Sequence, residues 1–145
     1  MRPIGYLSAP ELATLLSQPD AAAAVRVVDV RDSDYEGGHI RGCTHVPAHQ
    51  FLANVGAYAA RWRNDQRVVF HCMLSQVRGP KCATRLAATL ADGPPGGPDV
   101  FVLDGGWSAF VSGPARRGLC EGVDPRMWGG GQRDWGRQRD GRGVV

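Results

Sequence analysis

The clearest shortage in this sequence of 145 residues is lysine, because Lys81 is the single lysine among 17 basic residues. Together with the runs of alanine, the arginine bias indicates a GC-rich genome and carries no mechanistic weight. The formal net charge is only +3, and four arginines and two aspartates in residues 129–145 supply +2 of it. The remainder of the chain is nearly neutral, so its charge does not call for a nucleic-acid partner.

Long apolar runs are also missing, and none approaches the roughly 20 residues that a membrane-spanning helix needs. The first eight residues, MRPIGYLS, lack the hydrophobic segment of a secretory leader. The four cysteines show no C-x-x-C spacing and are expected to be reduced thiols in the cytoplasm or the nucleus; they are Cys43, Cys72, Cys82 and Cys120. We therefore expect a soluble protein without a membrane partner.

The pattern of apolar residues predicts strands that alternate with helices. Ser8 and Glu11 have the spacing of a capping box at the start of a helix. The short β-branched runs carry few polar residues, which is typical of strands buried on both faces of a parallel sheet. Helices are predicted over residues 8–18, 48–63, 80–90 and 107–111, and strands over 25–30, 67–70 and 100–103. This order predicts a three-layer α/β domain.

Residues 129–145, GGGQRDWGRQRDGRGVV, are rich in glycine and arginine and have too few apolar residues to pack. We predict that this tail is disordered. An arginine-rich tail that binds nucleic acid, with Trp135 stacking on bases, is the alternative. A plain unstructured end is the favoured interpretation.

The segment VVFHCMLSQVRGPKCA, residues 68–83, places a thiol where a buried strand ends. Ligands of open parallel sheets bind at the carboxyl ends of the strands, which is where His71 and Cys72 are expected. The N–H groups of residues 73–78 and the start of the next helix can surround an anion there. The same field favours the thiolate form of Cys72, which makes this cysteine the predicted nucleophile.

Arg78 follows Cys72 by six positions, and its planar guanidinium can bind two oxygens of the same anion. A lone cysteine at a strand end is often a buried apolar residue. Here the strand end, the arginine at this offset and the Gly79-Pro80 helix start coincide. The catalytic prediction is therefore Cys72 with Arg78. The predicted substrate-binding loop consists of Met73, Leu74, Ser75, Gln76, Val77 and Arg78.

Four segments together resemble the rhodanese fold: VVDVR at residues 27–31, YEGGHI at 35–40, the Cys72 loop, and LDGGW at 103–107. The loop HCMLSQVRGP most resembles small single-domain members related to the M-phase inducer phosphatases, a group that includes the eukaryotic arsenate reductases. The resemblance covers residues 4–119, the predicted rhodanese-like catalytic domain. It implies a central parallel sheet of about five strands, a Cys72 nucleophile and Arg78 as oxyanion ligand.

The length of the loop distinguishes activities within this family. Five residues separate Cys72 from Arg78, whereas rhodanese sulfurtransferases typically have one residue fewer. The wider loop resembles a cradle for phosphate or arsenate, which disfavours sulfur transfer. M-phase inducer phosphatases tend to carry a second cysteine where this chain has Val30, so their protective disulfide is not expected. Only Cys120 stands where plant arsenate reductases often have a zinc-binding tail, which argues against zinc.

The related phosphatases usually have acidic residues in the loop, and this loop has none. A proton donor for the leaving oxygen is therefore expected from acids beside the same sheet edge, or these acids are simply exposed to solvent. The candidates are Asp32, Asp34, Glu36 and Asp104.

Simple structural roles are expected for most of the other polar residues and cysteines. His71 is expected to support the loop rather than act as a base, and Cys82 is expected to be a buried thiol rather than a resolving cysteine. Cys43, His45 and His49 lack a fourth partner for a metal site, so no metal is predicted. The remaining predictions are that His39 supports the turn before Ile40, that Arg116 and Arg117 are a solvated pair or a docking patch for acidic substrates, and that Gly105 and Gly106 allow close turn packing.

These observations predict a cysteine-dependent phosphatase, of the tyrosine or dual-specificity type, that forms a phosphocysteine intermediate and needs no cofactor. Its substrate would be a phosphoprotein or a small oxyanion substrate. The alternative is an arsenate reductase that takes electrons from glutathione or glutaredoxin. A third hypothesis is a non-catalytic rhodanese module that binds partners, but an idle module has no physical need to retain both Cys72 and Arg78.

Overall fold

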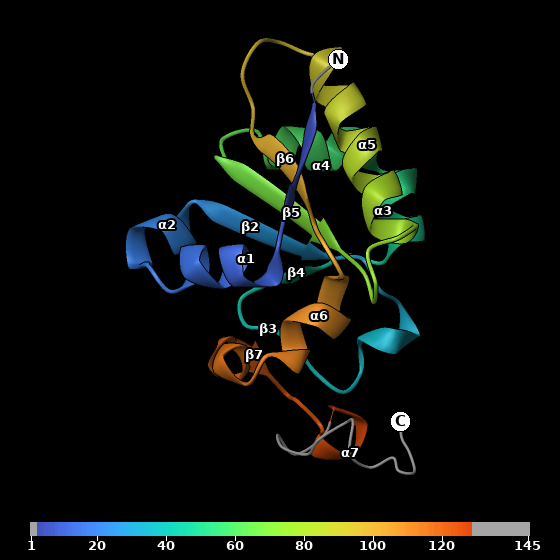
Figure 1. The fold of residues 1–145 in the computed structure, drawn as a ribbon. Coiled ribbons are helices and arrows are strands. Elements are labelled where there is room, and N and C mark those ends of the chain that lie inside the picture. Colours follow the sequence, from blue (N-terminus) through green and yellow to red (C-terminus); the bar gives the residue numbers. More distant parts are fainter. Residues whose placement is uncertain (1–2, 129–145) are drawn as a thin grey trace.

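The computed structural model describes residues 3–128, and the predicted disorder of residues 129–145 lies outside this range. Five parallel strands form the central sheet in the order β1-β6-β5-β2-β4 (Figure 1). The strands are β1 (Ile4–Leu7), β2 (Val25–Asp29), β4 (Thr44–His45), β5 (Arg67–His71) and β6 (Asp99–Leu103). The predicted parallel sheet of about five strands is thereby confirmed.

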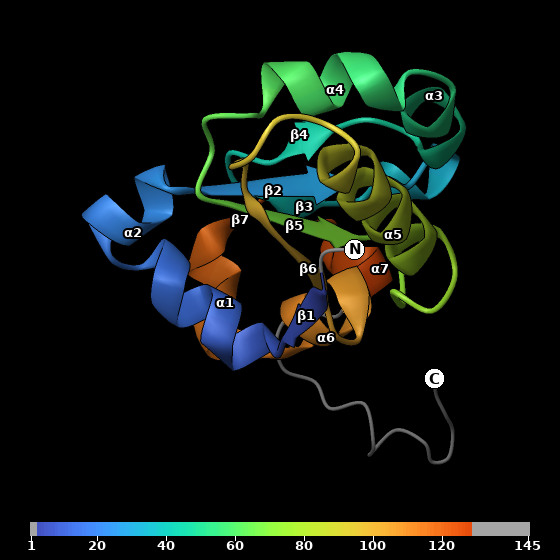
Figure 2. The ribbon, with the colours of Figure 1, turned by 90° about the horizontal axis from the view of Figure 1, so that it is seen from above.

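Helices cover both faces of this sheet, as Figure 2 shows. On one face lie α3 (Ala48–Ala53), α4 (Val55–Arg61) and α5 (Arg78–Ala91). On the other face lie α1 (Ala9–Leu16) and α6 (Gly106–Ser112). The molecule therefore has the three layers that the sequence predicted.

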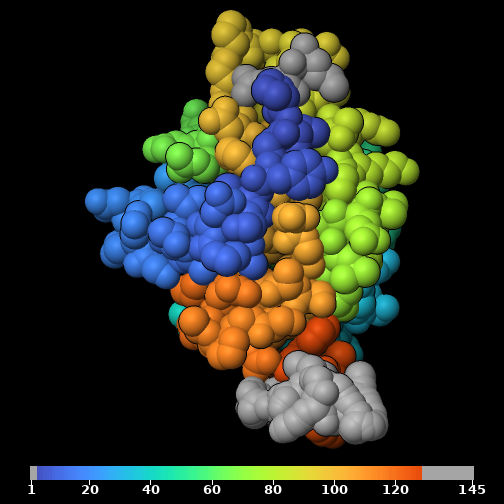
Figure 3. All heavy atoms as spheres, in the orientation of Figure 1, coloured from blue at the N-terminus to red at the C-terminus, as the bar shows by residue number. Residues whose placement is uncertain are grey.

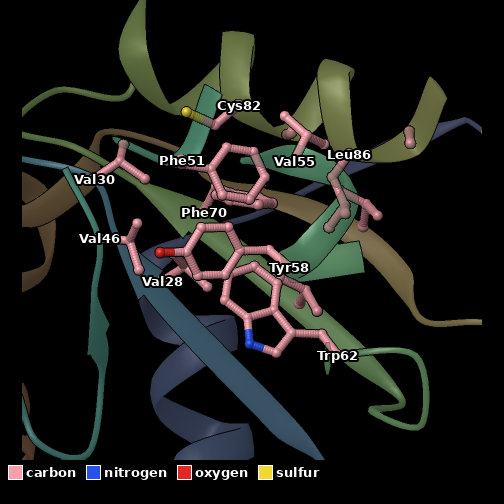
Figure 4. Packing of buried hydrophobic residues seen from close by; sticks show 14 of the residues in the cluster. Val28, Val30, Val46, Phe51, Val55, Tyr58, Trp62, Phe70, Cys82 and Leu86 are labelled. Atoms are coloured by element: carbon pink, nitrogen blue, oxygen red, sulfur yellow. The ribbon is translucent and has the colours of Figure 1, made fainter. Parts of the chain in front are cut away.

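The hydrophobic core is divided by the sheet, because successive strand residues point to opposite faces. In β5, Val68 and Phe70 belong to the cluster under α3, α4 and α5, whereas Val69 belongs to the cluster under α1 and α6. Figure 4 shows Phe51 and Trp62 packed with Phe70 in the first cluster. Both faces of β5 are thus buried, as its run of apolar residues predicted.

The first helix is confirmed, and its capping box is formed. The backbone N–H of Glu11 donates to Ser8 Oγ at 3.2 Å, and the N–H of Ser8 donates to Glu11 Oε1 at 2.8 Å. These two bonds satisfy backbone donors that the first turn of a helix leaves unpaired. α1 is nevertheless shorter than the predicted 8–18, since it ends at Leu16.

The prediction of one continuous helix over residues 48–63 was wrong. The structure has two helices, α3 and α4, separated at Asn54, whose φ of −135° and ψ of 31° are not helical. Asparagine hydrogen-bonds readily to nearby backbone, and Asn54 Nδ2 donates to Gln50 O at 3.0 Å. The apolar period nevertheless continues across the break, because Phe51, Val55 and Tyr58 are all buried.

Several short elements were not predicted, because too few residues define their period. They are α2 (Pro19–Ala23), the 3-10 helices η1 (Ser33–Tyr35) and η2 (Pro114–Leu119), the strands β3 (His39–Ile40) and β7 (Cys120–Glu121), and α7 (Pro125–Trp128); β1 and β4 were also missed. β3 and β7 pair antiparallel in a second, two-stranded sheet. On the face seen in Figure 3, the blue N-terminal segment lies beside the orange segment that contains α6 and η2.

No helix within residues 3–128 is long and apolar enough to cross a membrane.

Candidate active site

The parallel sheet places Cys72 at the carboxyl edge of its centre. Asp29 at the end of β2 pairs in register with His71 at the end of β5, and Cys72 follows directly. Only 3% of Cys72 is exposed, and it contributes to a small depression of about 180 Å³. The lining residues are Cys72, Met73, Leu74, Gln76, Val77 and Arg78. The structure therefore brings the predicted nucleophile, most of the predicted loop and Arg78 together at one site.

The loop between β5 and α5 leaves its backbone donors free. Among the described residues, none accepts a hydrogen bond from the N–H groups of residues 73–78. The next N–H, that of Gly79 in the first turn of α5, donates to Cys72 Sγ at 3.4 Å. Unpaired amides and a helix N-terminus beside a thiol are the features that stabilise a thiolate and bind an anion.

Ser75 stabilises the curled shape of this loop. It is the only non-glycine among the described residues with a positive φ, at 56°, and it is 7% exposed. Its Oγ accepts a hydrogen bond from the N–H of Cys72 at 3.4 Å. A left-handed serine costs free energy, and this contact helps to offset it. The sequence analysis included Ser75 in the loop but did not predict this role.

The start of α6 supports the loop from the other side. The N–H groups of Trp107 and Ser108 donate to the carbonyls of Cys72 and Met73, both at 3.0 Å. Gly106 has a φ of +60°, and a Cβ at this position would lie 2.5 Å from Cys72 O. Only glycine fits this close approach. The expectation that the Gly105-Gly106 turn allows close packing is confirmed for Gly106.

A buried charged network lies beneath the site. Asp29 and Arg31 are both fully buried, and Arg31 Nη2 donates to Asp29 Oδ2 at 2.7 Å. His71, also fully buried, has its Nε2 at 3.6 Å from Asp29 Oδ2, while its Nδ1 lies 3.1 Å from Cys72 O. Burial lowers the pKa of His71, against the pull of Asp29. His71 therefore supports the loop from behind, as expected.

The pKa of Asp29 is set by opposing effects. Burial raises it, but nearby His71 and Arg31 more than offset burial, so that the pKa lies below its usual value. Arg31 also donates to Gly38 O at 2.9 Å and to Asp34 O at 3.0 Å. It thereby ties the end of β2 to the segment that follows.

Arg78 is held by two of the predicted acids. Its Nη2 donates to Asp34 Oδ2 at 2.7 Å, and its Nη1 donates to Asp34 Oδ1 at 3.1 Å and to Asp32 Oδ1 at 3.3 Å. The hydrogen bond from Arg78 holds the pKa of Asp34 below its ordinary value, and the same bond raises the pKa of Arg78. Asp34 is therefore ionised and poorly suited to donate a proton. Of the other candidate acids, Glu36 and Asp104 are exposed and make no side-chain hydrogen bond within the described residues.

Cys43, Cys82 and Cys120 are not part of the loop at residues 72–78, and all four cysteines are free. Cys82 lies in the cluster of Figure 4 together with Val30, the position where related phosphatases tend to have cysteine. The pKa of Cys82 is raised to about 12, mainly by burial and secondly by the nearby Cys72, so Cys82 stays a thiol at neutral pH. Burial likewise raises the pKa of Cys43 and Cys120 to about 11 each. Within residues 3–128, no cluster of His, Cys, Asp and Glu could hold a metal ion.

The prediction for Arg116 and Arg117 as a solvated pair or docking patch was wrong. Arg116 donates to the carbonyls of Phe110 and Ala109, and Arg117 Nε donates to Val111 O. These bonds satisfy carbonyls at the end of α6, where helices leave acceptors unpaired. The two arginines therefore stabilise the helix that supports the loop.

His39 is positioned by a contact of 3.3 Å with Glu121 and by stacking on Tyr35.

Two features of the site were not predicted from the sequence. One is the Asp29–Arg31 ion pair, for which opposite charges two residues apart at the end of a buried strand were the available indication. The other is the pairing of Arg78 with Asp34, which depends on where the segment after β2 crosses the sheet edge. No local pattern in the sequence indicates that contact.

Comparison with known proteins agrees with this geometry. Residues 8–112 match the model of the rhodanese-like domain. A dual specificity phosphatase, ibp1 of Schizosaccharomyces pombe, is 32% identical over 76% of this chain and 90% of its own length. Arsenate reductase 2.1 of Oryza sativa is 34% identical over 75% of this chain and 68% of its own length.

A solved structure shares the same arrangement of strands and helices. It is that of Ygr203w, described as a yeast protein tyrosine phosphatase of the rhodanese family. It is 28% identical, has a TM-score of 0.74, and is matched over 88% of this chain and 99% of its own. With its sheet, its loop and these relatives taken together, the chain belongs to the family of rhodanese-like domains.

Proposed function

We propose that this protein is a cysteine-dependent phosphatase of the tyrosine or dual-specificity type. The observation that carries the proposal is the loop after Cys72, in which the N–H groups of residues 73–78 have no acceptor among the described residues and the N–H of Gly79, in the first turn of α5, donates to Cys72 Sγ. Such a loop matches the tetrahedral oxygens of a phosphoryl group. The phosphatases among the similar proteins support the same assignment.

In the proposed reaction, Cys72 Sγ attacks phosphorus and the bond from phosphorus to the ester oxygen breaks. The loop amides and Arg78 hold the non-bridging oxygens while charge redistributes. The leaving alcohol takes a proton from solvent or from an exposed acid, for which Glu36 and Asp104 are the remaining candidates. Water then hydrolyses the sulfur–phosphorus bond, releasing inorganic phosphate and restoring the thiolate.

Arsenate reduction is the second candidate, favoured by the similarity to the rice arsenate reductase. Cys72 would condense with arsenate to a thiol-arsenate adduct, with loss of water. Two electrons from glutathione or glutaredoxin thiols would reduce As(V) to As(III), while those thiols become a disulfide. The sulfur–arsenic bond would break in this step, which releases arsenite and restores the thiol of Cys72. The same loop would hold the oxyanion in both reactions.

The test is hydrolysis of p-nitrophenyl phosphate by the purified chain, with reductant and without added metal, beside Cys72→Ser and the control Cys43→Ser. We expect activity in the wild type and the control but not in Cys72→Ser, because Cys43 lies outside the loop. A wild type that is inactive on phosphate esters but reduces arsenate with glutathione would support the second candidate. Rapid sulfur transfer from thiosulfate to cyanide would contradict both.

A further inference from the structure

We propose that Asp34 is the positioning residue for Arg78, which it holds so that one edge of the guanidinium stays free for the oxyanion. This inference rests on the proposed function, in which Arg78 binds substrate oxygens. Asp34 lies in η1, well before Arg78 in the chain, and reaches it only because both segments meet at the carboxyl edge of the sheet.

The hydrogen bonds of Arg78 show which donors remain. Both hydrogens of Nη1 have acceptors, Asp34 Oδ1 and Asp32 Oδ1, whereas Nη2 donates only to Asp34 Oδ2. A guanidinium has five N–H donors. Within the described part of the chain, the Nε–H and the second Nη2–H are therefore unpaired. These two donors are adjacent and parallel, which is the geometry that binds two oxygens of one anion.

Asp34 is itself anchored to the buried network beneath the site. Its carbonyl oxygen accepts a hydrogen bond of 3.0 Å from Arg31 Nη1, and its Oδ1 accepts one of 3.1 Å from the N–H of Asp32. Arg31 is fully buried and is fixed by Asp29 at the end of β2. The carboxylate is therefore tied to the same sheet edge from which the Cys72 loop starts.

Two other roles for Asp34 give different expectations. If Asp34 competed with the oxyanion for Arg78, it would weaken oxyanion binding, and removal of Asp34 would tighten that binding. As a general acid, it would matter only for substrates with poor leaving groups. The free edge of Arg78 favours positioning over competition, and the ion pair that keeps Asp34 charged disfavours proton donation.

The experiment measures tungstate binding, by isothermal titration of the full chain with reductant, for wild type, Asp34→Asn and Asp34→Glu. The matched control is Asp92→Asn, at the opposite end of α5. We expect Asp34→Asn to weaken tungstate binding by about tenfold to a hundredfold, the value of one charge-assisted hydrogen bond. Asp34→Glu should recover part of this loss, and the control should match wild type.

The kinetics separate positioning from acid catalysis. The loss of kcat/KM in Asp34→Asn should be the same for p-nitrophenyl phosphate and for an alkyl phosphate ester. A loss confined to the alkyl ester would overturn the inference in favour of a general acid. Unchanged or tighter tungstate binding would overturn it in favour of no role or of competition.

A double-mutant cycle guards against a simple folding defect. Arg78→Lys keeps the charge but has no forked edge to orient, so Asp34→Asn should cause little further loss in that background. If Asp34→Asn caused equal losses of tungstate affinity in wild type and in Arg78→Lys, the result would contradict a positioning role for Asp34. If wild type binds tungstate through this pair but turns over neither phosphate esters nor arsenate, the proposed function fails and the inference stands. If wild type does not bind tungstate, both are wrong.

Discussion

The guanidinium of Arg31 is completely buried against the carboxylate of Asp29, with 2.7 Å between Nη2 and Oδ2. Removing one partner of such a pair leaves an uncompensated charge in a medium of low dielectric, which is strongly destabilising. The pair also fixes the segment that carries Asp34, through the bond from Arg31 to Asp34 O. Stability and the geometry of the site therefore depend on the same side chain.

We predict that Arg31→Met lowers the free energy of unfolding by about 3–5 kcal/mol. Urea unfolding of the purified protein measures this change. The matched control is Arg26→Met, because Arg26 pairs with Asp65 at 2.6 Å but both side chains are partly exposed. That pair should be worth at most about 1 kcal/mol. Equal losses in the two variants would show that burial does not set the cost.

His71 gives the stability a dependence on pH. Burial lowers its pKa below the ordinary 6.5, so the unfolded chain takes up a proton at a higher pH than the folded protein does. Stability should therefore be fully present above about pH 6.5 and fall as the pH decreases below it, by up to about 1.4 kcal/mol per pH unit from this group. Urea unfolding of wild type and His71→Asn between about pH 7.5 and 5 measures the difference.

The exposed His49 provides the control for this prediction. His49→Asn should keep the wild-type pH dependence, whereas His71→Asn should lose the part that His71 contributes. If both variants showed the wild-type slope, protonation of His71 would not limit stability in this range.

The contact of α6 with the Cys72 loop shows how one element positions another. Two N–H groups of α6 bond to the carbonyls of Cys72 and Met73, and this requires Gly106 with its positive φ. These bonds pair the carbonyls of Cys72 and Met73 with α6. The N–H groups of residues 73–78 have no acceptor among the described residues, which leaves them available for the proposed oxyanion.

We predict that Gly106→Ala reduces the proposed phosphatase activity by at least about a hundredfold, because misplacing a reacting group by about 1 Å has that effect. Its Cβ would lie 2.5 Å from Cys72 O and 2.6 Å from Met73 O. The control is Gly118→Ala, where an added Cβ would contact nothing within 4 Å. Hydrolysis of p-nitrophenyl phosphate, together with the urea midpoint, measures the effect. Full activity in Gly106→Ala would mean that the loop tolerates displacement.

The packing of the whole molecule continues past the predicted domain boundary at residue 119. Cys120 pairs with Ile40 in the small antiparallel sheet, and Trp128 packs edge-on against Trp107, with 5.9 Å between ring centroids. The bounds 4–119 stay a prediction. These contacts nevertheless connect β7 and α7 to the core that supports the site.

We predict that a chain ending at Leu119 is less stable than one ending at Trp128 by at least about 2 kcal/mol, the value of burying one large apolar side chain. Urea unfolding of the two truncated chains measures this difference. The activity of the shorter chain should fall as well, because Trp107 belongs to the helix that bonds to the loop. Equal stability of the two would place the boundary at residue 119.

Much of this molecule follows from local patterns in its sequence. Apolar runs identified β2, β5 and β6, because strands buried on both faces need continuous apolar residues. The capping residues located α1, and the strand end at His71 with the arginine at 78 identified the loop. The oxyanion site stays a prediction, which rested on the coincidence of the strand end, the arginine six positions after Cys72 and the Gly79-Pro80 helix start.

Only the tertiary structure decided the contacts between segments that are distant in the chain. Asp34 meets Arg78, α6 donates to the Cys72 loop, and Asp29 lies beneath His71 because the sheet order brings these ends together. Local sequence determines which elements form and which chemistry they carry, because propensity and period act over a few residues. Which carboxylate faces which arginine depends on topology, and topology results from packing the whole chain.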